Sequence, residues 1–220
     1  MKLIELDKIT FAYAPDEAPV LRDFSLSVGE GACVALLGDN GAGKTTLFRI
    51  LNGLSFPQQG SYRFDGVEIT AAYLKKQADQ KRFHKRVGYL FQNPDVMLFN
   101  GTVYDEIAFG PRQMGLPKAE LEARVGDCLD LFELRPLAGK APYHLSGGQK
   151  KQVALAAVLA LNPEVLILDE PLAGLDRKTQ EKLLRLLREL KAAGKTILIA
   201  THDPEVCSAL ADRSVVLEKE

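Results

Sequence analysis

The chain has 220 residues, of which 46% are hydrophobic and 26% are charged, and these ordinary globular values exclude a disordered chain. Its 28 Lys and Arg residues and 29 Asp and Glu residues leave a net charge of −1, which argues against a dedicated nucleic-acid binder. Three widely separated cysteines argue against a disulfide framework and a Cys-rich zinc site, and they favour a reducing cytosol. The apolar runs at residues 165–168 and 197–200 are far shorter than the roughly 20 residues of a membrane span. We therefore expect contact with a membrane only through partner proteins.

The order of the predicted elements indicates an α/β fold with a parallel sheet. Alternating or continuous apolar residues predict strands over residues 3–6, 9–13, 20–28, 33–37, 87–91, 165–168, 195–200 and 215–217, and a strand pair over 60–69 that turns at Asp65 and Gly66. Apolar residues at helical spacing predict helices over 44–51, 179–193 and much of 93–161, with breaks at 115–117 and Pro136. Buried strands that alternate with helices are typical of a parallel sheet. With no internal repeat or linker in view, we expect one domain with a helical insertion.

The segment 75–86 concentrates basic side chains in this nearly neutral chain. Such a run is compatible with nucleic-acid binding or with a solvated helix face. The interruption by Gln77, Ala78, Asp79 and Gln80 favours the solvated face. We expect no nucleic-acid partner.

Residues 38–45, with the sequence GDNGAGKT, fit the phosphate-loop pattern G-x-x-x-x-G-K-[ST]. Glycines let such a loop curl so that backbone N–H groups point inward at phosphate oxygens. The helix that follows adds its positive N-terminal end. In this pattern Lys44 reaches the β- and γ-phosphates, and the Thr45 hydroxyl binds Mg²⁺. The strand before the loop and the helix after it supply the required context.

Two carboxylates end the apolar run 165–168, in the sequence VLILDE. Ligands of parallel sheets bind at the carboxyl ends of the strands, so Asp169 is placed to hold Mg²⁺ there. Adjacent strand residues point to opposite faces, but at the end of a strand Glu170 can turn toward the same ligand. We expect Glu170 to orient or deprotonate an attacking water.

A second anion site is predicted at residues 145–149, with the sequence LSGGQ. Ser146 is a good N-cap, and Gly147 and Gly148 expose backbone N–H groups at the positive end of the predicted helix. Two such helix ends, far apart in the chain, either close on one ligand within the chain or meet across two chains. The sequence leaves both arrangements open, as well as an ordinary capped helix.

Taken together, these motifs resemble the ATP-binding subunits of ABC transporters over essentially the whole chain. In order, the matches are the Walker A loop at 38–45, the Q-loop Gln92, the signature motif at 145–149, Walker B at 165–170, the D-loop at 174–176 and the switch histidine, His202. The resemblance implies a P-loop NTPase of the ABC ATPase fold. That fold has a RecA-like parallel sheet core with an N-terminal antiparallel β-subdomain, expected over about 1–94 and 162–220, and a helical insertion subdomain over about 95–161.

The resemblance also implies roles for individual residues, with ATP and Mg²⁺ as the bound species. It implies that Lys44, Glu170 and His202 are catalytic, that Thr45, Gln92 and Asp169 hold Mg²⁺, and that Asp176 lies at a dimer interface. Tyr13 is expected to stack on adenine, against the alternative of a core aromatic residue. The remaining implied ATP contacts are Asn40, Gly41, Ala42, Gly43 and Thr46 with Lys44 and Thr45 in the same chain, and Ser146, Gly147, Gly148 and Gln149 from the other chain of a head-to-tail dimer.

Residues 91–99 (FQNPDVMLF) and 106–111 (EIAFGP) resemble the energy-coupling-factor branch of this family. That resemblance implies uptake of a micronutrient, cobalt or nickel first and biotin as the alternative, at the cytoplasmic face of the membrane. It implies a transmembrane coupling subunit, a substrate-capture subunit and a second ATPase chain, either a copy or a paralogue. An exporter ATPase and a soluble ABC ATPase are the rival functions. The chain departs from the pattern at Asp39, Met97 and Gln152.

Residues 97–114 carry more apolar side chains than a fully solvated segment would, among them Phe99, Val103 and Phe109. These side chains either dock on a membrane subunit or form the core of the helical insertion itself.

Overall fold

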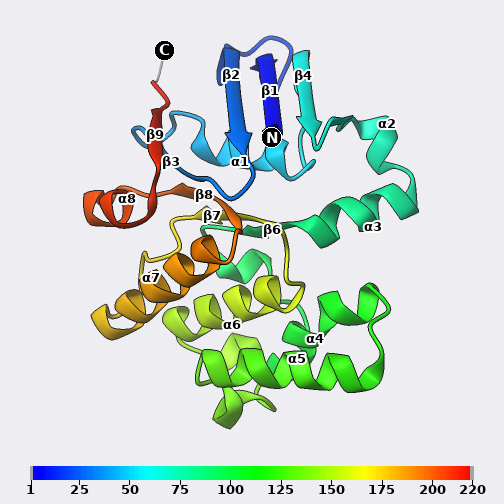
Figure 1. Cartoon of the computed structure of the whole chain (residues 1–220), viewed down its shortest axis with the longest axis vertical. Coiled ribbons are helices and arrows are strands. Elements are labelled where there is room, and N and C mark those ends of the chain that lie inside the picture. Colours follow the sequence, from blue (N-terminus) through cyan, green and yellow to red (C-terminus); the bar gives the residue numbers. More distant parts are fainter. Residues whose placement is uncertain (1, 219–220) are drawn as a thin grey trace.

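A computed structural model describes residues 2–218, and its strands form two separate sheets (Figure 1). The first sheet is antiparallel with strand order β2-β1-β4-β5 and lies at the top of Figure 1. The turn between β4 and β5 uses Asp65 and Gly66 in left-handed conformations, with φ of 51° and 74°, as the sequence predicts. The strands of this sheet are β1 (Lys2–Phe11), β2 (Leu21–Gly29), β4 (Gln59–Phe64) and β5 (Val67–Glu68).

The prediction of two strands over residues 3–13 is wrong, because β1 is one continuous strand. Its register against β2 shifts between Leu6 and Ile9, and Lys8 has a left-handed φ of 46° between them. The Lys8 N–H donates to the Ser25 hydroxyl at 2.9 Å. A β-bulge of this kind lets polar residues interrupt the apolar pattern without ending the strand.

The second sheet is parallel, with strand order β6-β7-β8-β3-β9. All residues of β7 and β8 are buried, as expected for strands covered on both faces. Along β3, Cys33 and Ala35 pack into one apolar core while Val34 and Leu36 pack into the other. The sheet therefore separates two cores and brings its strand ends to one edge. Its strands are β3 (Cys33–Leu37), β6 (Val87–Leu90), β7 (Val165–Asp169), β8 (Thr196–Ala200) and β9 (Arg213–Val216).

Helices cover the parallel sheet and extend below it in Figure 1, where α4, α5 and α6 lie together. The predicted helix at 44–51 coincides with α1, whereas α8 was not predicted although Asp203 and Pro204 form a helix-start signal. The helices are α1 (Lys44–Leu51), α2 (Ala71–Leu74), α3 (Gln77–Arg86), α4 (Val103–Gln113), α5 (Lys118–Leu131), α6 (Gly147–Ala160), α7 (Arg177–Ala192) and α8 (Pro204–Leu210). Short 3₁₀ helices occupy Pro94–Val96, Arg135–Leu137 and Pro142–His144.

The basic run at 75–86 lies largely on α3 and presents its Lys and Arg side chains outward. Phe83 is the buried residue of this helix and meets Phe64 edge-on, with ring centroids 5.6 Å apart. Arg86 at its end pairs with Asp65 at 2.9 Å and with Glu164 at 2.7 Å. These exposures match the interpretation of a solvated helix face.

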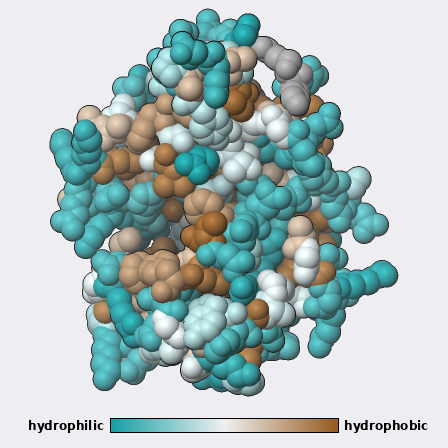
Figure 2. Space-filling model, turned by 180° about the vertical axis from the view of Figure 1, so that it is seen from behind, coloured by the Kyte–Doolittle hydropathy of each residue, from teal (hydrophilic) through white to brown (hydrophobic). Residues whose placement is uncertain are grey.

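Between residues 2 and 218, no helix combines the length and the apolar character that crossing a membrane requires. Figure 2 shows a surface that is mostly hydrophilic, with hydrophobic side chains gathered at mid-height between the upper and lower parts of the molecule. All three cysteines are free, and Cys33 and Cys128 are buried.

Candidate nucleotide site

Residues predicted from separate motifs gather around one cavity of about 450 Å³ at the carboxyl edge of the parallel sheet. The loop after β3 and the start of α1 form one wall, and the ends of β7 and β8 contribute the acidic residues and the histidine. The residues that line the cavity are Tyr13, Val20, Asn40, Gly41, Gly43, Lys44, Thr45, Thr46, Gln92, Asp169, Glu170 and His202.

The glycine-rich loop has the backbone that its sequence predicts. Gly38, Gly41 and Gly43 have φ of 142°, 85° and 96°, a region that favours glycine. A side chain at Gly38 would also place its Cβ 2.3 Å from the carbonyl oxygen of Leu217. Helix α1 starts at Lys44 and has no side-chain cap. The N–H groups of its first turn are therefore not used by a capping side chain. This loop and helix end form an anion-binding cradle.

Lys44 lines the nucleotide cavity, whereas Ala42 in the same loop does not. The Lys44 ammonium donates to the carbonyl oxygens of Gly38 and Asp39, the second at 2.9 Å, and its side chain is mostly buried. Ala42 is buried, does not line the cavity, and donates its N–H to the Asp39 carbonyl at 3.2 Å. Of the predicted loop contacts, Ala42 is thus the one directed away from the cavity.

Thr45 and Asp169 meet from opposite walls of the cavity. The Thr45 hydroxyl donates to Asp169 Oδ2 at 2.8 Å, although the two residues are 124 positions apart. Burial raises the pKa of Asp169, and the Thr45 hydrogen bond and the Lys44 charge oppose that shift. Hydroxyl and carboxylate oxygens are the ligands that Mg²⁺ prefers, usually with waters and phosphate oxygens completing the shell. The Thr45 hydroxyl and the Asp169 carboxylate supply two such oxygens, a pattern that fits an ion shared with a phosphate. Among residues 2–218, no group of three or more His, Cys, Asp or Glu side chains is placed to hold a metal ion.

Glu170 turns into the same cavity as Asp169 because its backbone is left-handed, with φ of 47°. Its N–H donates to the Ala200 carbonyl at 2.9 Å, which ties the turn to the end of β8. His202 Nε2 lies 3.4 Å from Glu170 Oε1, a buried oxygen without a hydrogen-bond partner among the described residues. Burial raises the pKa of Glu170, and His202 opposes that shift. An ionisable carboxylate that lines such a cavity is positioned to act as a general base.

Tyr13 lies at the rim of the cavity rather than in a core. Its side chain is 56% exposed, and its hydroxyl is 2.9 Å from Thr46 Oγ1. Phe11 packs edge-on against it, with ring centroids 5.1 Å apart. The alternative of a core strand aromatic is therefore wrong, and the ring is available for stacking.

The predicted second anion site lies outside this cavity. Ser146 caps α6, accepting from the Gln149 N–H at 3.3 Å, while Gln149 Oε1 accepts from the Ser146 N–H at 3.0 Å. None of residues 146–149 lines the cavity, which disfavours closure on one nucleotide within the chain. Asp176 is exposed and caps α7, accepting from the Thr179 N–H at 3.0 Å.

Lys151 is a residue of this region that the sequence analysis missed. It is 4% exposed, and its ammonium donates to the carbonyl oxygens of Glu170 at 2.6 Å and Ala173 at 2.9 Å. Burial lowers its pKa, against the charges of Glu170 and Asp169. A lysine four residues after Gly147 gives no sequence signal for such a contact, because the carbonyls come from a distant turn.

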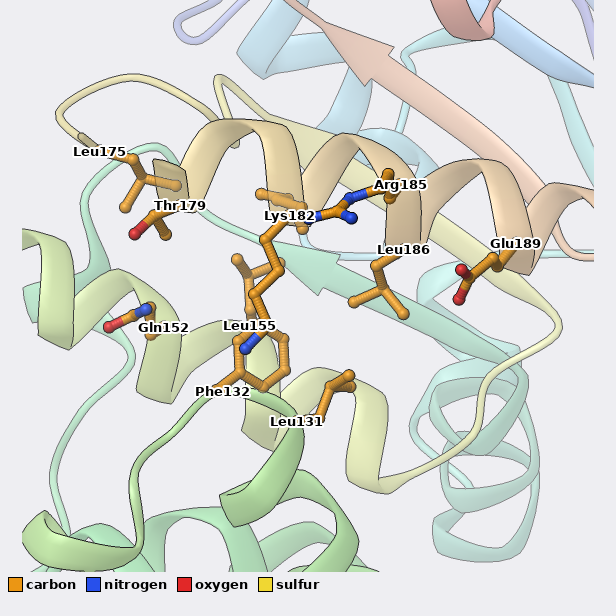
Figure 3. A pocket seen from close by; sticks show the side chains of 11 residues that line it. Leu131, Phe132, Gln152, Leu155, Leu175, Thr179, Lys182, Arg185, Leu186 and Glu189 are labelled. Atoms are coloured by element: carbon orange, nitrogen blue, oxygen red, sulfur yellow. The ribbon is translucent and has the colours of Figure 1, made fainter. Parts of the chain in front are cut away.

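A separate pocket of about 290 Å³ lies between α6 and α7 (Figure 3). Leu155, Phe132 and Leu186 give it an apolar interior, with Lys182 and Arg185 along α7. Gln152, one of the departures from the family pattern, lines this pocket and not the nucleotide cavity.

A family model described as ABC transporter matches residues 21–173, which is more than half of the chain. A model described as an AAA domain matches only residues 139–208, a stretch that leaves out the glycine-rich loop. The phosphate cradle and the acidic strand edge define a P-loop ATPase. With this match, the chain belongs to the ABC transporter family, as an ATP-binding domain.

Two relatives align over nearly the whole chain. The nickel import ATP-binding protein LarO of Lactiplantibacillus plantarum is 49% identical over 214 residues, which are 97% of this chain and 88% of the relative. The energy-coupling factor transporter ATP-binding protein EcfA of Methanothermobacter thermautotrophicus is 44% identical over 215 residues, or 98% of this chain and 68% of the relative.

Solved structures confirm the predicted fold class. The dimeric ATP-binding cassette MJ0796, in a post-hydrolysis state bound to ADP and Pi, matches with a TM-score of 0.88 and 29% identity, over 99% of this chain and 96% of that one. The protein cbiO1 of Clostridium perfringens, described as part of the ABC transporter complex cbiONQ, matches with a TM-score of 0.82 and 35% identity, over 98% and 84%. This chain is an ABC ATPase.

Proposed function

We propose that the chain is the ATP-binding subunit of an energy-coupling-factor-type ABC importer, working in a head-to-tail ATPase dimer to drive uptake of nickel or cobalt. The identities of 49% with a nickel import ATP-binding protein and 44% with an energy-coupling factor ATP-binding protein support this assignment. The observation that carries it beyond ATP hydrolysis is an exposed aromatic pair, Phe99 and Phe109, that borders an apolar hollow, described below. Work at the cytoplasmic face of a membrane then follows from the partner proteins.

The phosphate cradle holds the nucleotide. The N–H groups of Asn40, Gly41 and Gly43, which line the cavity, and of the start of α1 bind phosphate oxygens, and Lys44 contacts the β- and γ-phosphates. Thr46 follows Thr45 on α1, and its hydroxyl forms a hydrogen bond with the Tyr13 hydroxyl. The Tyr13 ring stacks on adenine, for which its 56% exposure leaves room.

Magnesium fits the oxygen ligands at the end of the cradle. The Thr45 hydroxyl and the Asp169 carboxylate lie 2.8 Å apart, and the Gln92 side chain lines the same cavity. These three residues would hold the ion, and a bound Mg²⁺ neutralises developing charge on the phosphate oxygens.

Hydrolysis needs a base for the attacking water and a contact for the γ-phosphate. The Glu170 carboxylate, which lines the cavity, accepts a proton from water, and the oxygen of that water attacks phosphorus as the bond to the β-phosphate oxygen breaks. His202, whose Nε2 lies 3.4 Å from Glu170 Oε1, donates to the γ-phosphate and orients the water. These two residues and Lys44 form the catalytic group.

The second chain completes the site. Residues 146–149 lie outside the cavity of their own chain, and the capped start of α6 exposes N–H groups suited to an anion. A head-to-tail dimer brings Ser146, Gly147, Gly148 and Gln149 of one chain to the ATP of the other, with Asp176 at the interface. The dimeric state of the ATP-binding cassette MJ0796 supports this arrangement.

Residues 97–114 contain both side chains that form the core of the helical region and side chains that are exposed and available for docking on a membrane subunit. Val103 and Ile107 are fully buried in the core of the helical region, whereas Phe99 is 67% exposed and Phe109 39% exposed. The two phenylalanine rings meet edge-on with centroids 4.9 Å apart.

The exposed pair is held in place rather than loosely attached. The buried Glu106 carboxylate accepts from the N–H groups of Phe99 at 2.9 Å and Asn100 at 2.7 Å, which fixes the loop before α4. Phe99 and Phe109 border a hollow of about 270 Å³ that also contains Phe91, next to Gln92. An apolar hollow of this kind fits a helix of a transmembrane coupling subunit. Phe91 in its lining is the sequence neighbour of Gln92, which lines the nucleotide cavity.

Affinity purification from native membranes tests the proposal. We expect a coupling-type membrane protein and a small capture subunit to accompany the chain, and metal analysis of that complex to detect nickel or cobalt. Phe99→Asp and Phe109→Asp should each abolish this co-purification without changing the unfolding temperature by more than a few degrees. Val67→Asp, at an exposed site on β5, is the matched control.

Each other outcome contradicts a defined part of the proposal. Recovery of a permease of the exporter type, or of no membrane protein, contradicts the assignment as an importer subunit. Bound biotin in place of metal contradicts the assignment of nickel or cobalt as the transported solute. Loss of folding in the Phe99 variant would assign that residue to the core of the helical region.

A further inference from the structure

Lys151 connects two parts of the molecule that the sequence separates. It lies in the second turn of α6, four residues after Gly147, on the helix whose start is the signature motif. Its side chain crosses to the turn after β7, where its ammonium donates to the carbonyls of Glu170 at 2.6 Å and Ala173 at 2.9 Å. At 4% exposure it makes these contacts out of water, where a hydrogen bond to a charged group is strong.

The turn that Lys151 holds has an unfavourable backbone. Glu170 has a φ of 47°, a left-handed conformation that is unfavourable for residues other than glycine. Apart from Lys151, its backbone is held by the bond of its N–H to the Ala200 carbonyl and by a longer bond of 3.3 Å from the Ala173 N–H to its own carbonyl. A single cation that bridges residues 170 and 173 therefore stabilises the conformation that turns the Glu170 side chain into the cavity.

The same turn also packs on the start of α6. A side chain at Gly148 would place its Cβ 3.7 Å from the Gly174 carbonyl, so the two backbones lie close together. The first turns of α6 and residues 170–174 are thus joined both through Lys151 and through this close backbone approach.

We propose that Lys151 is a positioning residue for ATP hydrolysis, which keeps Glu170 turned toward the nucleotide by tying residues 170–173 to α6. Lys151 does not line the cavity and acts through the backbone of Glu170. The inference rests on the role proposed for Glu170 as the base.

Lys151→Met removes the donors and keeps the length of the side chain. Because misplacement of a reacting group by about 1 Å can cost about 100-fold in rate, we expect kcat to fall about 10- to 100-fold. The KM for ATP and the affinity for ATP in a binding assay should stay within twofold. Lys151→Arg, which keeps donors for both carbonyls, should recover most of the rate.

Lys191→Met is the matched control. The Lys191 ammonium also donates to a backbone carbonyl, that of Leu210 at 2.8 Å, and to Asp212 at 2.7 Å, but none of these three residues lines the nucleotide cavity. This variant should keep the wild-type kcat. Equal kcat values in the Lys151→Met and Lys191→Met variants would overturn the inference. If Lys151→Met does not fold, Lys151→Gln takes its place. This variant keeps a neutral amide group on a shorter side chain, and we expect a smaller fall in kcat with an unchanged KM for ATP.

A double-mutant cycle with Glu170→Gln separates positioning from general stability. If Lys151 acts through Glu170, adding Lys151→Met to the Glu170→Gln variant leaves the residual turnover within twofold. A further tenfold loss in the double variant overturns the inference. Wild-type turnover in Glu170→Gln alone refutes the proposed base itself, whereas loss there with normal kcat in Lys151→Met refutes only the role of Lys151.

Discussion

Replacement of Glu170 by Gln exchanges one carboxylate oxygen for an NH₂ group. We expect this variant to lose ATP hydrolysis and to keep the fold. The left-handed turn is held by backbone contacts to Ala200 and Lys151, and neither of them uses the Glu170 side chain. Burial raises the pKa of the Glu170 carboxyl, so the folded state carries this charge at a cost that the neutral amide avoids. We therefore expect the variant to be at least as stable as the wild type near neutral pH.

The loss in turnover follows from the loss of the carboxylate base. The Glu170 side chain lines the nucleotide cavity and keeps 14% exposure, so water in the cavity reaches its carboxylate. A general base contributes about 10²- to 10⁴-fold, or about 2.7–5.4 kcal/mol of activation free energy. Steady-state phosphate release measures the rate, and equilibrium binding of ATP should be unchanged.

The control for this variant is Glu164→Gln. Glu164 precedes the same strand, β7, at its opposite end, where it is exposed and pairs with Arg86 at 2.7 Å. Such a pair is worth about 0–1 kcal/mol, so its loss should leave turnover intact. Turnover of the Glu170→Gln variant within threefold of the wild type would refute the assignment of the base.

Three further predictions concern the same cavity. Tyr13→Ala should raise the Kd for ATP about tenfold through loss of stacking, and Tyr13→Phe should bind within threefold of the wild type; equal affinity of the Ala variant in a binding isotherm would contradict the stacking role. Because His202 opposes the effect of burial and lowers the pKa of Glu170, His202→Ala should raise that pKa and move the acid limb of the remaining kcat to higher pH, and a pH profile with an unmoved limb would count against this coupling. Thr45→Val should raise the Mg²⁺ concentration for half-maximal hydrolysis at least about tenfold without changing ATP binding in EDTA, whereas an unchanged Mg²⁺ titration would remove Thr45 from the metal site.

The strand β7 shows which features of the site can be predicted from local sequence patterns and which cannot. Its apolar residues predict a buried strand, which the structure contains, and the two acids after it predict a ligand site, for which the structure shows both residues lining one cavity. The side-chain alternation of a strand, however, would send Asp169 and Glu170 to opposite faces. Their presence in one cavity depends on the left-handed φ at Glu170, which contacts with Ala200 and Lys151 stabilise.

Exposed and buried apolar residues of one segment could not be separated from sequence. Phe99 and Val103 are both apolar and lie four residues apart, yet one is 67% exposed and the other is fully buried. The difference arises because α4 packs against α6, while the Glu106 carboxylate holds the loop of Phe99 outside that contact.

The sequence by itself determined the phosphate loop, the buried strands, the capped α6 and the family, because each depends on residue types at short, regular spacing. Only the tertiary structure decided that Thr45 reaches Asp169, that residues 146–149 stay outside the cavity, and that Lys151 supports the turn of Glu170. Those contacts join residues up to 124 positions apart, and the packing of the sheet and helices, rather than any local preference of the chain, brings such residues within hydrogen-bond distance.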